Sequence, residues 1–575
     1  MTERTPSATA MPRTGVPTRA SALVFSTKAS LLRVHRLMRD IAPGTAPRRQ
    51  PRSAALREAP VIASVSSPLW TASGGAKNHA LNAGKIQNLR AALRGIDAIE
   101  VAAGETFSFW RHVGRPVRRR GFVAGRELRE GCMIATIGGG LCQLSNALYE
   151  AALDARLEIV ERHAHTRIVP GSRAAEGRDA TVFWNYLDLR LRAEHAFRIE
   201  ARLTTDTLEV EIRSHAQFAD APTASLFTGL SANDCLNCGQ VSCHRHDPDQ
   251  PRRMATPIAW LVDAPSPEFA AQYRAEAGPD DILLLPTRRF GSNAQSWPRI
   301  GREHTADLTA LQRSIALRLH AGRAPLAALM LTADARMAAA HARALSPLNT
   351  HLVIAQTLLP HLWRAGILQG RHFDVLLDRL PMHALHHILD TARARHAESP
   401  TLGDFRAPAS IVAAERAALT AARRLITPHH AVADHFPDRI ELIDWVPATP
   451  LPFRKGGHRF LFAGPAVARK GVHAMREAMA GLEIELLIER SAEEEPGFWS
   501  GLKVRRAGSG EQPIELAGVV LPALLEHRPH TLLRALAAGL PVIATAACGL
   551  PPQPGLTLIE AGDVHGLRSA MLAAI

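Results

Sequence analysis

The sequence predicts an α+β domain with one central helix on an antiparallel sheet, followed by two α/β lobes built on doubly wound parallel sheets. Residues 61–218 combine a clear helical pattern after Cys142 with several runs of strand-like alternation. From residue 254 onward, short apolar runs alternate with helical patterns, which is typical of parallel strands joined by crossover helices. This alternating region is long enough for two lobes, and the boundary between the lobes falls near residues 444–457.

Composition bounds the class of protein. The chain has 575 residues, of which 46% are hydrophobic and 21% charged, as expected of a globular protein with several domains. Its net charge of +14 is concentrated in residues 1–60, where eleven Lys and Arg face three acidic residues, a local balance of +8. The rest of the chain carries little net charge, so the sequence predicts no specific nucleic-acid groove there. We expect residues 1–60 to be a basic, disordered tail with at most a short helix at LLRVHRLMRD.

The apolar runs of the sequence indicate the cellular location that we expect for the protein. No stretch reaches the roughly 18 apolar residues that a membrane span needs. The early basic residues are not followed by the apolar core of a signal peptide. We therefore expect a cytoplasmic protein, with peripheral membrane contact through the basic tail as the alternative role for its charge.

A thiol site is predicted by the stretch IGGGLCQLSNALYEAALDA, residues 137–155. Cys142 follows three glycines and stands where a helical pattern begins, a position whose free amides and dipole favour a thiolate. A thiolate needs a base and a group that orients the base, and His163 or His165 with Asp179 supply these types on the following strand-like runs. Gln143 or the glycine amides would stabilise an oxyanion. The alternative interpretation is a tight turn beside a small buried cysteine and structural histidines.

The same residues resemble a known family. The series GETFSFW, GGGLCQLSNALYEAAL, LEIVERHAHTR and GRDATVFWNYLDLRLR is similar to the VanW family over roughly residues 85–212. The family is named for an accessory protein of glycopeptide-resistance clusters, so the resemblance implies a link to the cell envelope. It implies no particular reaction, because the family has no settled activity. The layout of Cys, His and Asp is shared by thiol acyl-transfer enzymes of the transglutaminase and papain kinds.

A cysteine cluster lies in the segment 219–250, which we interpret as a linker. Three thiols and two imidazoles fall within twelve residues, in the pattern Cys-x2-Cys-x4-Cys-His-x-His. Zn²⁺ favours four such ligands in a tetrahedron, and the candidate ligands are Cys235, Cys238, Cys243 and His246. An iron–sulfur cluster is the alternative metal site, and a plain linker or a disulfide are the alternatives without metal.

The C-terminal half also resembles a known family. FAGPAVARKGVHAMREAM and LPALLEHRPHTLLRALAAGLPVIATAACGL are similar to the nucleotide-sugar lobe of GT-B glycosyltransferases of the retaining, group 1 kind. The resemblance covers about residues 254–575 and is clear from residue 458. It implies a GT-B-like pair of Rossmann lobes and a nucleotide-sugar donor. The expected organisation is thus a tail over 1–60, the VanW-like domain over 61–218, the linker over 219–250, and lobes over 251–446 and 447–575.

The residues that the glycosyltransferase resemblance implies are only partly present. Lys470 matches the lysine that binds the diphosphate, and Glu526 matches the first member of the acidic pair. The expected arginine falls on Pro465, for which Arg469 is the candidate substitute. Arg534 stands where the second acid, which contacts the ribose, belongs. A non-catalytic lobe is therefore the alternative interpretation of this half.

Three functional hypotheses follow from these patterns. The first is an envelope-related enzyme that performs thiol chemistry on an acyl or peptide-bearing glycan precursor. The second is a glycosyltransferase that uses a nucleotide-sugar donor, with the VanW-like domain as its acceptor-binding module. The third is a non-catalytic scaffold whose glycosyltransferase-like half has lost its activity.

Overall fold

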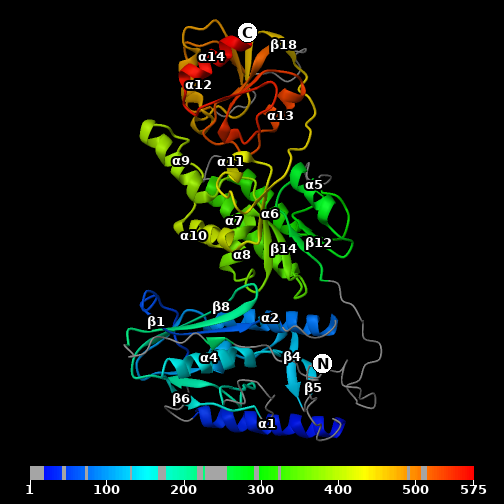
Figure 1. The fold of residues 1–575 in the computed structure, drawn as a ribbon, viewed down its shortest axis with the longest axis vertical. Coiled ribbons are helices and arrows are strands. Elements are labelled where there is room, and N and C mark those ends of the chain that lie inside the picture. Colours follow the sequence, from blue (N-terminus) through cyan, green and yellow to red (C-terminus); the bar gives the residue numbers. More distant parts are fainter. Residues whose placement is uncertain are drawn as a thin grey trace, which may run out of the picture. The chain divides into compact units, whose positions relative to one another are not determined.

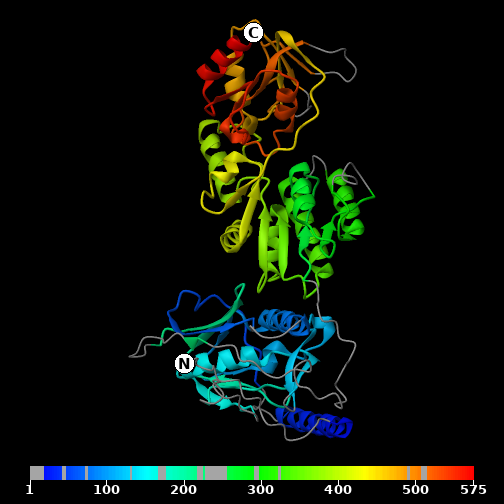
Figure 2. The same cartoon turned by 45° about the vertical axis from the view of Figure 1, so that its right-hand side comes forward.

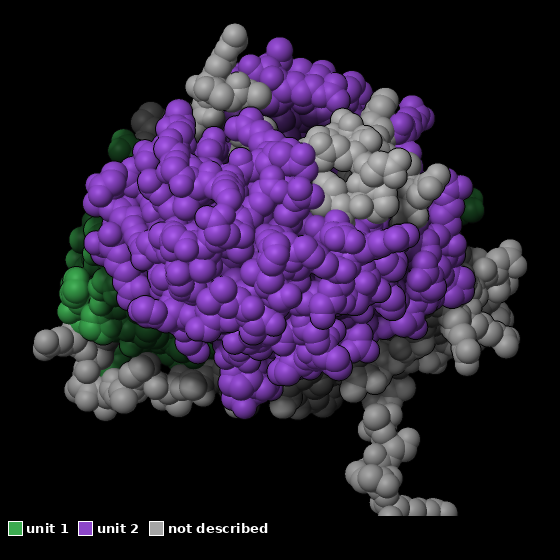
Figure 3. All heavy atoms as spheres, turned by 90° about the horizontal axis from the view of Figure 1, so that it is seen from above, with its two compact units in different colours: residues 1–256, 346–350, 366–371 green, residues 257–345, 351–365, 372–575 purple. Residues whose placement is uncertain are grey.

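The structure of the protein is a computed structural model, and its chain divides into two compact units, coloured separately in Figure 3. Unit 1 comprises residues 1–256, 346–350 and 366–371, and unit 2 comprises residues 257–345, 351–365 and 372–575. The residues described are 18–41, 47–70, 76–129, 132–165, 177–216, 225–226, 256–289, 297–320, 326–488, 493–506 and 515–575.

An antiparallel sheet forms one layer of unit 1, and Figure 1 labels its strands β1 and β8. Its strand order is β10-β1-β9-β8-β2, and only the β1–β10 pair is parallel. The alternation of TLEVEIR in β9 turns Leu208, Val210 and Ile212 into the core, as period-two patterning requires. The strands are β1 (Val61–Pro68), β2 (Ile99–Val101), β8 (Phe197–Leu203), β9 (Thr207–Arg213) and β10 (Ser225–Leu226).

Helix α4 (Cys142–Asp154) packs on β1 and β9, and it begins at Cys142 as the sequence predicts. Its buried face holds Leu144, Leu148 and Ala151 at helical spacing. A second long helix, α2 (Ala76–Ile96), contacts β8 and the hairpin β4–β5. The remaining elements are α3 (Phe109–Val113), the 3₁₀ turn η1 (Arg118–Arg120), β4 (Ala124–Arg129), β5 (Cys132–Ile137), and the sheet of β3 (Thr106–Ser108), β7 (Arg190–Arg192) and β6 (Glu158–Glu161).

The basic tail is more ordered than predicted, because residues Arg19–Ile41 form the helix α1, which contains the predicted short helix at LLRVHRLMRD and extends it toward the N-terminus. Figures 1 and 2 show α1 along the side of unit 1 next to β6. Arg36 is 5% exposed, and its guanidinium pairs with Glu161 at 2.8 Å and with Asp188 at 3.3 Å. Long-range ion pairs of this kind lie outside what local composition can indicate. None of the helices in the described ranges has the length and apolar character needed to cross a bilayer.

The first lobe of unit 2 is a parallel sheet of order β13-β12-β11-β14-β15-β16-β17. The order reverses between β11 and β14, which is the doubly wound arrangement that the sequence predicts. The strands are β11 (Ala259–Leu261), β12 (Ile282–Leu285), β13 (Arg302–Thr305), β14 (His351–Ala355), β15 (His372–Leu376), β16 (Arg424–Thr427) and β17 (Ile440–Leu442). The helices are α5 (Pro267–Glu276), α6 (Asp307–Leu319), α7 (Leu326–Ala344), α8 (Leu359–Arg364), α9 (Met382–Arg395), α10 (Ala409–Ala421) and α11 (His430–Ala433), with the 3₁₀ turn η4 (Gln356–Leu358).

The second lobe has the parallel strand order β20-β19-β18-β21-β22-β23, and its order reverses between β18 and β21. The predicted pair of Rossmann lobes is therefore confirmed by both sheets. The strands are β18 (Arg454–Phe462), β19 (Glu485–Ile488), β20 (Val504–Arg506), β21 (Glu515–Leu521), β22 (Val542–Thr545) and β23 (Leu556–Ile559). The helical elements are η5 (Ala468–Lys470), α12 (Val472–Met479), α13 (His530–Ala537), η6 (Ala546–Cys548) and α14 (Val564–Ala574).

The ion pairs of Arg36 provide a test of how α1 is held. Replacing Arg36 by Met removes the guanidinium from two buried carboxylates, so we expect a loss of about 3 kcal/mol in the free energy of unfolding. The matched control is Arg39→Met on the same helix, since the Arg39 side chain is 56% exposed while also pairing with Glu161. This variant should lose less than about 1 kcal/mol. Denaturant unfolding of both variants measures the difference, and equal losses would contradict the buried role of Arg36.

Candidate thiol site and interlobe pocket

A glycine turn places Cys142 at the start of α4. Gly140 has a φ of 95°, and a Cβ on it would lie 2.2 Å from Cγ of Lys85 on α2. A Cβ on Gly139 would lie 2.3 Å from the carbonyl oxygen of Gly125. Side chains are therefore excluded here by both conformation and space. Asn88 of α2 fixes the turn, because its amide donates to the Gly139 carbonyl at 2.9 Å.

The Cys142 side chain is half-buried against the segment that follows Asp179. Its Sγ lies 3.6 Å from Oγ1 of Thr181 and 4.0 Å from the carbonyl oxygen of Val182. As the first residue of α4, Cys142 also has a backbone N–H that no carbonyl of the helix can accept. The thiol and this amide thus stand together at the positive end of the helix dipole.

Two polar side chains in the next turn of α4 hold that neighbouring segment. The Ser145 hydroxyl donates to the Ala180 carbonyl at 2.6 Å, and Oδ1 of Asn146 accepts from the Ala180 N–H at 2.8 Å. Both contacts are to one residue, so they fix Asp179 and Thr181 on either side of it. The sequence pattern around Cys142 does not by itself assign this role to Ser145 and Asn146. Their spacing of three and four residues after Cys142, on the same helical turn, is a signal that could have identified them.

The structure separates the two candidate bases. His165 Nδ1 lies 2.6 Å from Oδ2 of Asp179, whose same oxygen accepts from the His165 backbone N–H at 2.7 Å. The ring of His165 also lies close enough to Cys142 to lower the pKa of its thiol, and Nε2 is the ring nitrogen that Asp179 does not occupy. His163 instead contacts Oε1 of Glu161 at 3.1 Å. The structure therefore brings together Cys142, His165 and Asp179, while His163 lies outside this group.

Asp179 is itself fixed by Arg162, which sequence analysis also missed. Asp179 is buried, and its Oδ1 accepts from the Arg162 guanidinium at 2.6 Å while Oδ2 faces His165. The Arg162 guanidinium lies 5.2 Å from the ring centre of Tyr149 on α4. The two carboxylate oxygens are thus used by different partners, and the orientation toward His165 is determined on both sides.

The electrostatics of the pair favour a thiolate. Burial by itself raises the pKa of Cys142, but the hydrogen bond and charge of His165 outweigh it, so that pKa lies below its usual value. Burial lowers the pKa of His165, yet contacts with Cys142 and Asp179 raise that pKa to about 9. Because each group stabilises the charge of the other, they titrate as a coupled pair, and both directions favour a thiolate beside an imidazolium.

Gln143 has a different environment from the one that the sequence suggests. Its Nε2 donates to Oγ of Ser67 and to the carbonyl of Pro68, both at 2.8 Å. These bonds use both amide hydrogens and tie the start of α4 to the end of β1. At the helix start the N–H groups of Gln143 and Leu144 donate to the carbonyls of Gly140 and Leu141, so the candidate donor to an oxyanion is the backbone N–H of Cys142.

A second group of predicted residues lines an open pocket of about 1530 Å³ between the lobes of unit 2. Lys470 follows β18 and Glu526 follows β21, so both stand at the point where the sheet order reverses. Lys470 Nζ lies 2.9 Å from Oε2 of Glu526 and 2.7 Å from the Leu525 carbonyl oxygen. The Arg469 guanidinium lies 4.7 Å from the ring centre of Phe405 at the same pocket.

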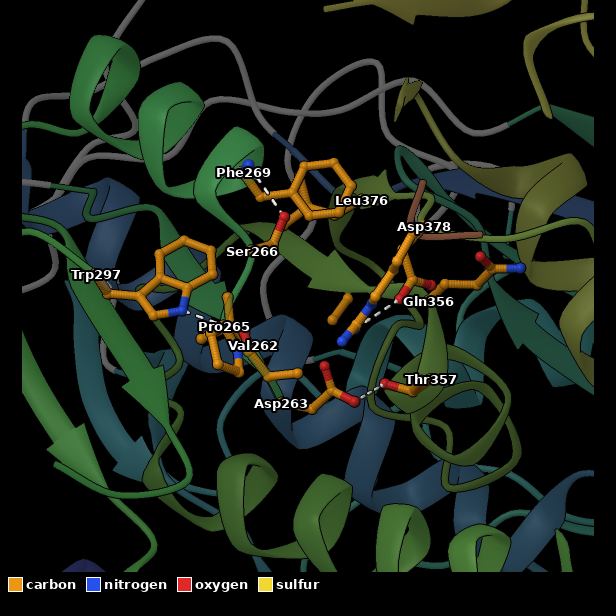
Figure 4. A pocket seen from close by; sticks show the side chains of 13 residues that line it. Val262, Asp263, Pro265, Ser266, Phe269, Trp297, Gln356, Thr357, Leu376 and Asp378 are labelled. Atoms are coloured by element: carbon orange, nitrogen blue, oxygen red, sulfur yellow. Dashed lines mark hydrogen bonds and ion pairs between the residues drawn. The ribbon is translucent and has the colours of Figure 1, made fainter. Parts of the chain in front are cut away.

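Acidic side chains line the first-lobe side of the pocket. Asp263 follows β11 and hydrogen-bonds to Thr357, which follows β14; Figure 4 shows this contact in a smaller adjoining pocket. Burial, then the charge of Asp378, raises the pKa of Asp263. Burial, then the charge of Asp263, raises the pKa of Asp334 to about 7. Both lobes contribute charges of both signs, since Arg313 and Arg379 line the first-lobe side beside these acids and Glu526 lines the second-lobe side beside Lys470.

The predicted metal ligands Cys235, Cys238, Cys243 and His246 lie outside the described residues. Within the described ranges, no group of three or more His, Cys, Asp or Glu side chains could hold a metal ion. The proposed zinc or iron–sulfur site therefore stays a prediction from the sequence.

Comparison with known proteins identifies part of unit 1. Residues 84–213 match the family model described as VanW like protein. The uncharacterized protein YoaR of Bacillus subtilis is 37% identical over 114 residues, which are 20% of this chain and 37% of that protein. The vancomycin B-type resistance protein VanW of Enterococcus faecalis is 31% identical over 125 residues, which are 21% of this chain and 46% of that protein. The chain thus spans less than half the length of either relative.

Solved structures that resemble the rest of the chain are glycosyltransferases. The lipopolysaccharide outer core galactosyltransferase WaaB has 14% identity and a TM-score of 0.33, with 55% of this chain and 90% of that chain covered. Anabaena Alr3699/HepE in complex with UDP and glucose has 12% identity and a TM-score of 0.32, covering 55% and 89%. At this similarity the two-lobe assignment rests on the strand order of this chain itself. The chain therefore carries a VanW-like domain over residues 84–213, followed by two doubly wound α/β lobes.

Proposed function

We propose that the VanW-like domain is a thiol acyl-transfer enzyme that acts on an acyl or peptide-bearing glycan precursor of the cell envelope. The observation that carries this proposal is the placement of Cys142, His165 and Asp179 at the start of α4. The name of the Enterococcus relative associates that protein with vancomycin resistance, which supports an envelope substrate.

In the first step, the Cys142 thiolate attacks the carbonyl carbon of the acyl group, and a C–S bond forms. The carbonyl oxygen gains negative charge, which the backbone N–H of Cys142 stabilises at the helix start. When the bond to the leaving amine or hydroxyl breaks, the imidazolium of His165 supplies the proton that this group takes away. The product of the step is a thioester on Cys142 beside a neutral His165.

In the second step, an acceptor hydroxyl, amine or water attacks the thioester, and neutral His165 takes its proton. The C–S bond breaks and the thiolate returns beside an imidazolium. Asp179 accepts the hydrogen bond from Nδ1 throughout, so that Nε2 remains directed at the thiol. Thr181, at 3.6 Å from the sulfur, contacts the thiol on another side.

The proposal predicts a covalent intermediate. Incubation of the full chain with a peptide-bearing cell-wall glycan precursor should give an acyl adduct on Cys142 that hydroxylamine removes, because a thioester is cleaved by that nucleophile. Peptide mass spectrometry locates the adduct. The Cys142→Ala variant should give none while unfolding at the same temperature as the wild type. Full turnover by this variant would overturn the thiol mechanism.

The charge state of the thiol gives a second prediction. At neutral pH, iodoacetamide should alkylate Cys142 rapidly, since the pKa of the thiol is lowered, and should spare Cys548, whose pKa burial raises to about 12. His165→Gln removes the cationic partner, so the alkylation midpoint should move upward by about one pH unit, with an about tenfold slower rate at neutral pH. His163→Gln is the matched control and should leave the profile unchanged. Equal effects of the two variants would show that His165 is not the base that acts on Cys142.

A second candidate function, nucleotide-sugar transfer, is favoured by the pocket between the lobes. Arg469 and Lys470 line it from the loop after β18, and a diphosphate is the anion that suits such cations at a strand-order reversal. In this function the VanW-like domain would bind the acceptor. Arg534, which stands at the position of the second acid, is a cation whose Nε donates to the Thr449 carbonyl at 3.2 Å, so this position offers a ribose no carboxylate.

Calorimetry with UDP- and GDP-sugars tests this function separately. We expect one of these donors to bind, and Lys470→Met to weaken it by at least about tenfold because a buried cation facing the diphosphate is lost. Lys503→Met is the matched control, since the Lys503 side chain is 66% exposed and outside the lining of the pocket. Absence of heat with every donor, or an equal effect of both variants, would count against a donor site at Lys470.

A further inference from the structure

Helix α1 carries an apolar stripe on the side that faces away from its own domain. The domain side of the helix includes Ala29 and Arg36, each 5% exposed and seven residues apart. The opposite side at helical spacing is apolar yet open to solvent. Its members, with their exposed fractions, are Leu23 (69%), Val24 (67%), Leu31 (68%), Val34 (55%) and Met38 (60%). The usual burial of an amphipathic helix is therefore reversed in α1.

Cationic side chains border this stripe. At 100° per residue, Lys28 falls along one border and Arg19 along the other, and both residues are exposed. Arg33 and Arg39 lie further toward the domain, where they contact the Trp184 carbonyl and Glu161. The sole acidic residue of α1 is Asp40, which is turned toward the domain by its contacts with Arg36 and Arg190. The outward surface of α1 is thus mainly apolar along its centre, where the polar Thr27 donates its hydroxyl to the Leu23 carbonyl, and it is positive at its edges.

The domain holds the helix in this orientation by polar contacts. Arg36 pairs with Glu161 and Asp188, and Arg33 Nε donates to the Trp184 carbonyl at 2.7 Å. Phe25 adds an edge contact with Phe183, with ring centres 6.2 Å apart. The helix is therefore already formed, so a binding surface need not supply the free energy that orders it.

We propose that the stripe of α1 docks on a membrane surface that contains anionic lipid. The apolar side chains would enter the boundary between headgroups and acyl chains, and the bordering cations would contact the lipid phosphates. A second copy of this chain fits less well, because pairing two such stripes brings rows of like charge together with no outward-facing acid on either helix. This surface does not rest on the thiol site, so the two proposals can fail independently.

Vesicle co-sedimentation of the full chain tests the surface. We expect binding to phosphatidylcholine vesicles that contain phosphatidylglycerol, weaker binding at high salt, and little binding to phosphatidylcholine alone. The double variant Leu31→Asp with Met38→Asp should partition at least about tenfold more weakly, because charge replaces the apolar centre of the stripe. Leu572→Asp is the matched control: it changes a 53% exposed leucine on α14 and should bind as the wild type does.

Two results would overturn the proposal. One is undiminished vesicle binding by the double variant. The other is a wild-type chain that does not bind anionic vesicles but is a dimer by light scattering, while the double variant is a monomer. That result would assign the stripe to contact with a second copy. Thermal unfolding checks that the variant is folded. If it is not, Lys28→Glu with Arg19→Glu keeps the stripe intact, and it should lose binding to the anionic vesicles; retained binding would contradict the charged border.

Discussion

The hydrogen bonds from α4 to Ala180 are the constraint on which the thiol site depends. Ser145 and Asn146 bind the carbonyl and the amide of this one residue, so the chain on either side cannot slide along the helix. Asp179 is thereby placed where it meets His165, and Thr181 where it meets the sulfur. The same helix presents Cys142 at its first position. One short helix thus carries Cys142 and fixes the position of Asp179, the carboxylate that faces His165.

Part of the thiol site follows from the sequence, and the rest depends on where a strand ends. Glycines before a helical pattern were sufficient to place Cys142 at the helix start. The sequence does not decide between His163 and His165, because the alternation in ERHAH suggests a strand with both rings on one face. Strand β6 ends at Glu161, so the two rings take different partners. Gln143 illustrates a related limit, since its contact with the end of β1 joins segments that lie far apart in the sequence.

The lobes of unit 2 were easier to predict than their polar contacts. Buried parallel strands are apolar throughout, so short apolar runs such as those of β12 and β22 can be recognised as strands in the sequence. The helical patterns between these runs indicate that the sheet is parallel. Helix α1 shows the opposite case. Its composition resembles a solvated basic tail, and its position is explained by contacts with residues far along the chain, above all the carboxylates of Glu161 and Asp188. Tertiary ion pairs leave no periodic signal in either partner's local sequence.

The contact between Lys470 and Glu526 determines how an anion would enter the interlobe pocket. The Lys470 ammonium group already contacts the Glu526 carboxylate at 2.9 Å and the Leu525 carbonyl at 2.7 Å. An incoming phosphate would therefore have to displace these partners. Glu526 Oε1 also accepts from the backbone amides of His527 and Arg528, which would retain the carboxylate after Lys470 is released. In the proposed donor site, a monoanion would merely replace an equal partner of Lys470, whereas a polyanion would offer more charge than it displaces.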